Sequence, residues 1–382
     1  MTTIKFKLEQ NNNIYELDIR KNEDFLEKQI KVVSEIINSK EEAVYYHLYN
    51  NETKKFIEDI DKLNKKTCYI MKNTSKEAQT AVSTIKNILS KMKENNNLTS
   101  TQASELKILV FNLKNYLLID SFAEEFIAYA GLENLIEAIQ EISGNIRSYA
   151  INSLKSILVF KNAIEYIREN PVVVYNLYNI LMSNSLFENA MSTIITHTLG
   201  ILFLLCDVLK DEGVSMILNA ADKYAEENDK KIFNELVGFL YNTDIQVKLN
   251  TMTLIYIMIK SCNKKSKQNK ILALLNNAEL IVALNKNGDL KSDIFQNQLS
   301  NFQKLTGELI KGSYYEIELY KCKVKDIENH CYHLEKKLEY IFLNQRFYNE
   351  VVEDFIAYQQ MADTALEIGG YYDPCKIYKY VK

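Results

Sequence analysis

Residues 213–240 read GVSMILNAADKYAEENDKKIFNELVGFL, and residues 244–260 continue as DIQVKLNTMTLIYIMIK. The apolar residues of these stretches recur at helical spacing, which predicts a short helix, a break, a second helix and then a longer helix. Such a unit has an apolar face that it cannot bury alone, so neighbouring units must stack against it. If the unit recurs, the stretch decides the fold in favour of a stacked helical array.

The unit does recur along the chain. Similar segments begin at Phe122, Asn162, Gly213 and Lys267, at intervals of 40, 51 and 54 residues, and each is followed by a long apolar helix. Three helices in about 40–50 residues are typical of an armadillo-type repeat. The chain has 10 Gly and 2 Pro in 382 residues, well below the usual shares of about 7% and 5%, as expected for a helix-rich protein. We predict a mostly α protein with an armadillo-repeat superhelix over residues 74–313, whose third helices line a concave, partner-binding face.

The first 73 residues follow a different pattern. Apolar residues alternate with charged ones on both sides of an Asn cluster, at Ile4, Phe6 and Leu8 and then at Tyr15, Leu17 and Ile19. This alternation predicts a β-hairpin. A helix follows, with Asn22 as the expected N-cap and Asp24 in the first turn, and then three short strand-like segments. The order predicts a small α+β ubiquitin-like domain over residues 1–73.

The composition and motifs argue against several classes of protein. The formal net charge of −4 gives no general attraction to nucleic acid. No phosphate-binding loop, zinc-protease motif or nucleophile elbow occurs in the sequence, so we expect no enzyme and no cofactor. His330, Cys331 and His333 form a small cluster that would not share one helical face, so we expect no metal site.

The six Cys residues and the apolar stretches indicate the compartment. No two Cys form a CxxC pair, and we expect free thiols in a reducing environment. The start of the chain lacks the apolar segment of a signal peptide. The most apolar stretch, Ile194–Leu209, is shorter than the roughly 20 residues of a membrane span. We therefore expect a soluble, cytoplasmic protein with no membrane span.

Several basic residues of the N-terminal hairpin suggest a binding surface. Lys5 and Lys7 project from one side of the first strand, and Arg20 and Lys21 end the second. Ubiquitin-like domains that bind small GTPases pair such a basic strand with the acidic switch region of the GTPase. We name Lys5, Lys7, Tyr15, Arg20 and Lys21 as candidate GTPase-binding residues. The alternative is a set of ordinary solubilising lysines.

The C-terminal part, residues 314–382, is richly charged and helical in pattern. Leu334, Leu338 and Ile341 share one helical face, and mixed charges flank it, as they do beside a coiled-coil seam. The face must be covered, either by a second copy of the chain or by the last repeat, which the segment would then cap. Both a dimerising and a capping role remain open.

Parts of the chain resemble a known family. AINSLKSILVFKNAIEYI, IITHTLGILFLLCDV and VKLNTMTLIYIMIKS are similar to the armadillo, or formin-homology 3 (FH3), region of diaphanous-type formins. The resemblance is strongest from Ser148 to Lys260 and extends at its widest over Ser121–Leu343. FAEEFIAYAGLENLI and QLSNFQKLTGELI also look like the engulfment and motility (ELMO) scaffolds, which is the second choice.

The resemblance implies a function without catalysis. It implies a regulatory region that binds a Rho-family small GTPase, works as a homodimer at the actin cytoskeleton or cell cortex, and controls actin indirectly by autoinhibition. It also implies a groove for the protein's own C-terminal autoregulatory segment, lined by Phe160, Leu204, Asp207, Thr253 and Tyr256. Phe160 and Tyr256 stand where the family has polar amides, and Asp207 where it has an apolar contact. Alternatives are an ELMO-like scaffold for a GTPase exchange factor and a peptide-binding armadillo adaptor.

Overall fold

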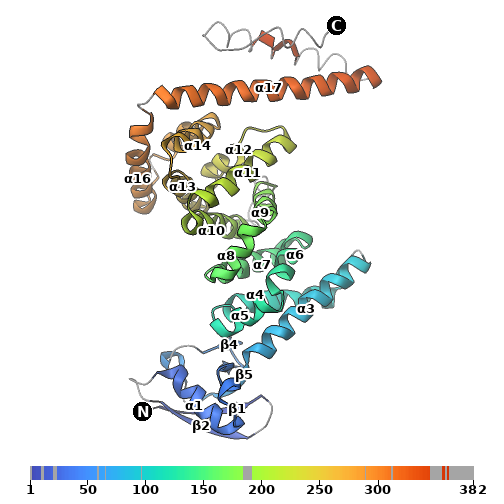
Figure 1. Cartoon of the computed structure of the whole chain (residues 1–382), viewed down its shortest axis with the longest axis vertical. Helices are drawn as coiled ribbons and strands as arrows, with labels where there is room; N and C mark the ends of the chain where they lie inside the picture. Colours follow the sequence, from blue (N-terminus) through green and yellow to red (C-terminus); the bar gives the residue numbers. More distant parts are fainter. Residues whose placement is uncertain are drawn as a thin grey trace. The chain divides into compact units, whose positions relative to one another are not determined.

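The fold was obtained as a computed structural model. It describes residues 2–9, 13–19, 24–57, 60–64, 66–95, 97–183, 192–288, 290–310, 313–344, 355–357 and 359–360. The chain forms two compact units, Met1–Val173 and Val174–Lys382. The first unit contains a five-stranded sheet and the first helices, and the residues that the structure describes in the second unit form no strand (Figure 1).

The sheet has the strand order β2-β1-β5-β3-β4. Its strands are β1 (Thr2–Leu8), β2 (Ile14–Ile19), β3 (Tyr46–Asn50), β4 (Lys55–Phe56) and β5 (Cys68–Asn73). β1 runs antiparallel to β2 and parallel to β5, and helix α1 (Phe25–Ile37) contacts β2 and β3. This mixed sheet with a helix confirms the ubiquitin-like prediction.

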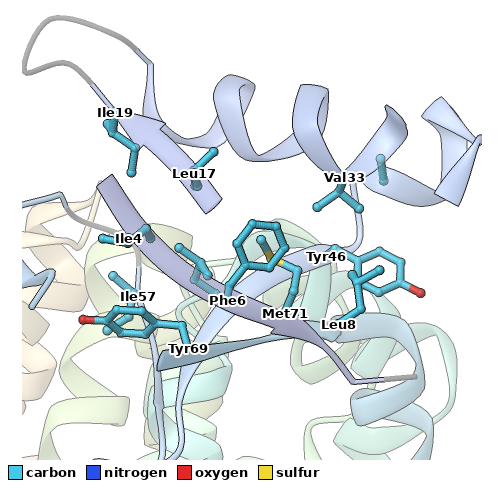
Figure 2. Packing of buried hydrophobic residues seen from close by; sticks show 12 residues of the cluster. Ile4, Phe6, Leu8, Leu17, Ile19, Val33, Tyr46, Ile57, Tyr69 and Met71 are labelled. Atoms are coloured by element: carbon cyan, nitrogen blue, oxygen red, sulfur yellow. The ribbon is translucent and has the colours of Figure 1, made fainter. Parts of the chain in front are cut away.

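The alternation seen in the sequence places one side of the hairpin in a core. Ile4, Phe6, Leu17 and Ile19 are buried with Val33 of α1 in one cluster (Figure 2). The expected cap of α1 was wrong, because Asp24 rather than Asn22 is the N-cap. Its carboxylate accepts hydrogen bonds from the backbone N–H groups of Leu26 and Glu27 at 2.9 and 3.0 Å. Asn22 lies outside the described residues.

The sheet runs directly into the helical part. β5 ends at Asn73 and α3 (Thr74–Asn95) begins at the next residue. Helix α4 (Ser100–Tyr116) follows, with a capping box in which Thr99 and Gln102 each bond the other's backbone. The switch from strands to helices therefore falls where the change from a two-residue to a 3.6-residue period predicts it.

Four triplets of helices then follow, each ending in a helix of 14 to 18 residues. Their bounds are α5 (Asp120–Ala128), α6 (Gly131–Glu141) and α7 (Gly144–Ile157); α8 (Lys161–Glu169), α9 (Val172–Ser183) and α10 (Ser192–Leu209); α11 (Asp211–Asn228), α12 (Asn234–Gly238) and α13 (Ile245–Lys260); and α14 (Lys265–Asn277), α15 (Leu280–Lys286) and α16 (Asp293–Ile310). The predicted armadillo-like repeat is confirmed.

The third helices of neighbouring triplets pack together in the second unit, where α13 contacts both α10 and α16. In the first unit the third helix α7 contacts α4, the helix that precedes the first triplet. By length and composition alone, helix α10 is long and apolar enough to cross a membrane. Core packing accounts for this composition, because eight of its residues, including Leu202 and Leu205, are buried.

A repeated backbone feature marks three of the triplets. The residue before the second helix has a left-handed conformation at Ala130 (φ 63°), Phe233 (φ 68°) and Glu279 (φ 65°). Glycine adopts this conformation without the steric cost that a Cβ brings. The chain uses other residues instead, which fits its low glycine content and leaves a local cost at each turn.

The last described long helix, α17 (Ser313–Asn344), packs against α14 and α16 in the second unit. Lys325 pairs with Asp222 of α11 at 3.0 Å, and Asp326 is hydrogen-bonded to the side-chain amide of Asn277 on α14. Burial raises the pKa of Asp326, so this contact places a carboxyl group in an environment that disfavours its charged form.

Candidate functional site

The outer face of the β1–β2 hairpin carries the first group of predicted residues. Thr3, Lys5 and Lys7 lie opposite Asp18, Glu16 and Ile14 in the strand register. The Thr3 hydroxyl donates to Asp18 Oδ1, and Lys5 faces an acidic neighbour directly. The lysines are therefore interleaved with carboxylates, so this face carries mixed charge. β2 forms an edge of the sheet, and an edge strand can pair with a strand of another protein.

The other predicted GTPase-binding residues lie elsewhere. Tyr15 points to the core side of the hairpin, where its ring stacks on Phe6 with centroids 5.6 Å apart. Arg20 and Lys21 lie outside the described residues. Of the five candidates, the structure therefore places Lys5 and Lys7 on one outer face and Tyr15 on the opposite side.

An aromatic cluster joins the sheet to the helices of the first unit. Tyr116 of α4 packs edge-on against Phe56 of β4 and Phe122 of α5, with centroids 5.2 and 5.5 Å apart. Its hydroxyl lies 3.1 Å from the hydroxyl of Tyr49 on β3. Burial, and then the bond to Tyr49, raise the pKa of Tyr116, so the Tyr116 hydroxyl stays protonated over the physiological pH range.

A polar cluster lies beside the aromatic one. The Ser121 hydroxyl is 2.9 Å from Thr74 Oγ1 and 3.1 Å from His47 Nε2, and Thr74 donates to the carbonyl of Tyr45 at 2.8 Å. Ser75 donates to Glu125 at 2.6 Å. Burial lowers the pKa of His47 to about 4. These bonds tie β3 and the start of α3 to α5, so the sheet and the first repeat form one packed body.

Lys72 makes a third connection in this region. Its ammonium pairs with Glu9 at 3.2 Å and with Glu77 of α3 at 3.0 Å, and it lies over the ring of Tyr49. Burial alone would lower the pKa of Lys72, but the two carboxylates outweigh it and raise that pKa. Sequence reasoning missed this role, because Glu9 and the ring of Tyr49 come from segments far from Lys72 along the chain.

The expected autoregulatory groove falls mainly on two neighbouring helices of the second unit. Leu204 and Asp207 lie on α10, Thr253 and Tyr256 lie on α13, and these four residues are partly or fully exposed. The fifth, Phe160, is the N-cap of α8 in the first unit.

Polar contacts shape this α10–α13 face. Asp207 stands where an apolar residue was expected from the resemblance. Its carboxylate pairs with Lys210 at 3.0 Å, and the ion pair offsets the negative charge of Asp207. Thr253 Oγ1 accepts a bond from the side-chain amide of Gln298 on α16 at 2.6 Å. Sequence reasoning missed Gln298, although it is the first residue of the segment QLSNFQKLTGELI.

The predicted dimerisation residues are partly covered within the chain. Leu334 is 1% exposed, and Leu338 and Phe355 pack against it. The side chain of Ile341 lies outside the described residues. Intrachain packing thus covers Leu334 without a second copy, and a dimer through this helix stays a prediction.

The described residues show no group of His, Cys, Asp and Glu that could hold a metal ion. His333 lies 3.5 Å from Asp229 of the second unit. Cys206 and Cys262 are buried, and burial raises the pKa of both thiols, that of Cys262 to about 11. These thiols are part of the packed core, where they are protonated and unreactive.

Comparisons with known proteins agree with the repeat region. Residues 144–283 match the family described as the FHOD1/3 FH3 domain. Formin-G of Dictyostelium discoideum is 28% identical over 210 residues, 55% of this chain and 19% of the relative. Formin-C of the same organism is 24% identical over 208 residues, 54% of this chain and 17% of the relative. The chain thus spans about a fifth of the length of these relatives.

Solved structures were also compared. The E. histolytica Formin1 bound to EhRho1-GTPgammaS has 15% identity and a TM-score of 0.44, and the match covers 62% of this chain and 87% of that chain. A designed armadillo repeat protein in complex with the peptide (KR)4 has 15% identity and a TM-score of 0.42, with 61% and 89% covered.

The matched sequences favour the formin resemblance over the ELMO-like alternative. An FH3 domain is regulatory and non-catalytic, in agreement with the prediction of no enzymatic activity. Residues 144–283 are therefore similar to a formin-type FH3 domain, and about half of the chain is similar in sequence to formins.

Proposed function

We propose that this chain is the N-terminal regulatory region of a formin, which binds a Rho-family small GTPase and acts by mutually exclusive binding. The observation that carries the proposal is the direct junction of a ubiquitin-like sheet to the helices that lead into an FH3 domain. Ubiquitin-like sheets recognise partners by pairing an edge strand, and β2 lies at such an edge. In this proposal the protein is cytoplasmic and its effect on actin is indirect.

Because the β1–β2 face carries both lysines and carboxylates, charge reversals of opposite sign can test whether this face binds the GTPase. A GTPase with an acidic switch region would be attracted by Lys5 and Lys7 and repelled by Glu16, which lies opposite Lys5. Rim charges act mainly on the association rate and on its salt dependence. Lys5→Glu/Lys7→Glu should therefore slow association at low salt, and Glu16→Lys should speed it.

The measurement is stopped-flow association of a GTP-loaded Rho-family protein with residues 1–382 at two salt concentrations. Lys91→Glu, an exposed lysine on α3, is the matched control and should leave the rate unchanged. If the charge variants and the parent chain associate at equal rates, Lys5 and Lys7 do not lie at the interface. If no Rho-family protein binds the chain in either nucleotide state, the main functional proposal is wrong.

The second part of the proposal concerns autoinhibition. The partly exposed α10–α13 face would hold the protein's own C-terminal autoregulatory segment, with Leu204, Thr253 and Tyr256 in contact with it. A charge at the contact should weaken that binding. Tyr256→Glu should therefore lower the inhibition of actin assembly when this region is added to the formin's assembly domain. Tyr241→Glu, at an exposed position of the same unit, should retain it.

A further inference from the structure

A pocket of about 470 Å³ lies in the first unit where the sheet meets α5. Its walls come from α1, from the turn before β3, from β3 itself and from the segment that enters α5. The charged outer face of the β1–β2 hairpin contributes none of the lining residues. The pocket is therefore separate from the surface proposed to bind the GTPase.

The rim of this junction pocket is apolar and accessible to solvent. Leu26, Val44 and Leu118 line it, and they are 44%, 41% and 54% exposed. They come from three separate segments of the chain, so the fold, not a local sequence run, gathers them. Clustered exposed apolar side chains of this kind mark interaction sites, whereas single ones are normal on any surface.

One wall of the pocket is acidic. Asp120 and Glu124 lie on α5 four residues apart, so they stand on the same side of the helix. Both are exposed. Among the lining residues that the structure describes, no lysine or arginine balances these two carboxylates. A ligand that fills the apolar pocket would therefore gain from a positive charge next to its apolar group.

The walls are held in place before any ligand binds. Ser121 is bonded to His47 across the junction at 3.1 Å, and Gln29 of α1 accepts from the backbone N–H of Leu48 on β3 at 3.1 Å. A site that is already ordered loses less conformational freedom on binding, which favours affinity.

We propose that this pocket docks a short segment of a partner protein that carries a large apolar residue beside Lys or Arg. The volume suits one or two side chains, and the exposed rim around it needs a ligand that extends beyond the pocket. A small molecule would leave Leu26 and Leu118 in water, whereas a peptide segment covers them. The two carboxylates of α5 then select the basic residue.

The test is a selection of displayed random peptides on the immobilised chain, followed by fluorescence anisotropy with the selected peptides. We expect sequences with an aromatic or aliphatic residue near Lys or Arg. Because the docked segment covers Leu118 at the rim of the pocket, the charge introduced by Leu118→Asp would be buried without a partner, and binding should weaken by about tenfold. Asp120→Lys/Glu124→Lys should weaken it similarly and reduce its salt dependence.

Ile108→Asp is the matched control, because Ile108 is 60% exposed on α4 of the same unit and does not line the pocket. This variant should bind the peptides as the parent chain does, and unchanged melting curves should show that all variants fold. The proposal is overturned if no peptide is selected, if selected peptides are acidic, or if Leu118→Asp binds them equally well. If a GTP-loaded Rho-family protein displaces the peptide, the pocket is not separate from the GTPase-binding surface, and the proposal is overturned.

Discussion

His47 is a buried imidazole at the junction of the sheet and α5, and burial lowers its pKa from 6.5 to about 4. The folded protein keeps it neutral while the unfolded chain binds a proton below pH 6.5. Stability should therefore be unaffected at pH 7 and fall as the pH drops from 6.5 to 4. The full loss is about 3 kcal/mol, since one pKa unit corresponds to about 1.4 kcal/mol.

The measurement is chemical unfolding of the parent chain and of His47→Asn at several pH values between 7 and 4. The variant lacks the titrating group and should lose about 3 kcal/mol less over this range. Parallel pH curves for the two proteins would show that His47 does not titrate as its environment predicts. A nearby carboxylate, Asp120, opposes the shift, so the variant Asp120→Asn should move the transition to lower pH.

Glu279 is one of the left-handed residues that precede the second helix of a triplet. A non-glycine residue pays a steric cost of about 1 kcal/mol or more in this conformation. Glu279→Gly should therefore stabilise the second unit by about 0.5–1 kcal/mol, after the greater freedom of glycine in the unfolded chain is subtracted. Glu279→Ala keeps the steric cost and is the control. A lower melting temperature for the Gly variant would contradict this account.

At the scale of elements, the joint between the sheet and the helices rests on a few long-range contacts. The hydroxyls of Tyr49 and Tyr116 are partners at 3.1 Å in a buried site. Tyr49→Phe and Tyr116→Phe should each destabilise the first unit, because each leaves the other hydroxyl unpaired. The double variant should cost less than the sum, with a coupling of about 0.5–1.5 kcal/mol.

The experiment is a double-mutant cycle by denaturant unfolding, read from signals of the first unit. Tyr129→Phe, a partly exposed residue on the same unit, serves as the neutral control. Additive effects of the two changes would show that the hydroxyl contact contributes nothing measurable to stability.

Elements with strong local patterns could be predicted from the sequence. The hairpin followed from alternation at Ile4, Phe6 and Leu8, and the repeat followed from the spacing of apolar residues in the third helices. The cap of α1 could not be placed, because Asn22 and Asp24 are both good N-cap residues and only tertiary packing fixes where the helix begins. The left-handed turns also escaped prediction, since the usual signal, glycine, is missing at Ala130 and Glu279.

The candidate site was predicted less well than the fold. Lys5 and Lys7 project as expected, but their pairing with Glu16 and Ile14 depends on strand register, which the sequence alone did not fix. The contacts of His47 with Ser121 and of Lys72 with Glu9 join distant segments, so no local pattern reveals them. The pocket at the junction has the same origin, because its rim residues come from three separate segments.

At the scale of the whole molecule, the open question is self-association through α17. The resemblance to formins implies a dimer, and Leu338 packs beside the buried Leu334. We predict that residues 1–382 form a dimer and that a chain ending at Lys311 is a monomer. The measurement is solution mass by light scattering, with Leu338→Asp as a variant that should also give a monomer.

Monomers for both lengths would show that Phe355 and the last repeat cover the apolar face of α17. In that case the segment only caps the array, and the result would favour a monomeric scaffold over a formin regulatory region. A dimer that persists in the shorter chain would place the contact in the repeats instead.

The direct passage from Asn73 to Thr74 has a consequence for protein engineering. Because no spacer separates β5 from α3, and because Tyr116 and Ser121 complete the packing of the sheet, residues 1–73 are not an exchangeable cassette. A chimera that grafts another GTPase-recognition module at this position would expose the aromatic surface of α4 and α5. A graft boundary after α8, which keeps the sheet with its helices, would preserve the fold on both sides.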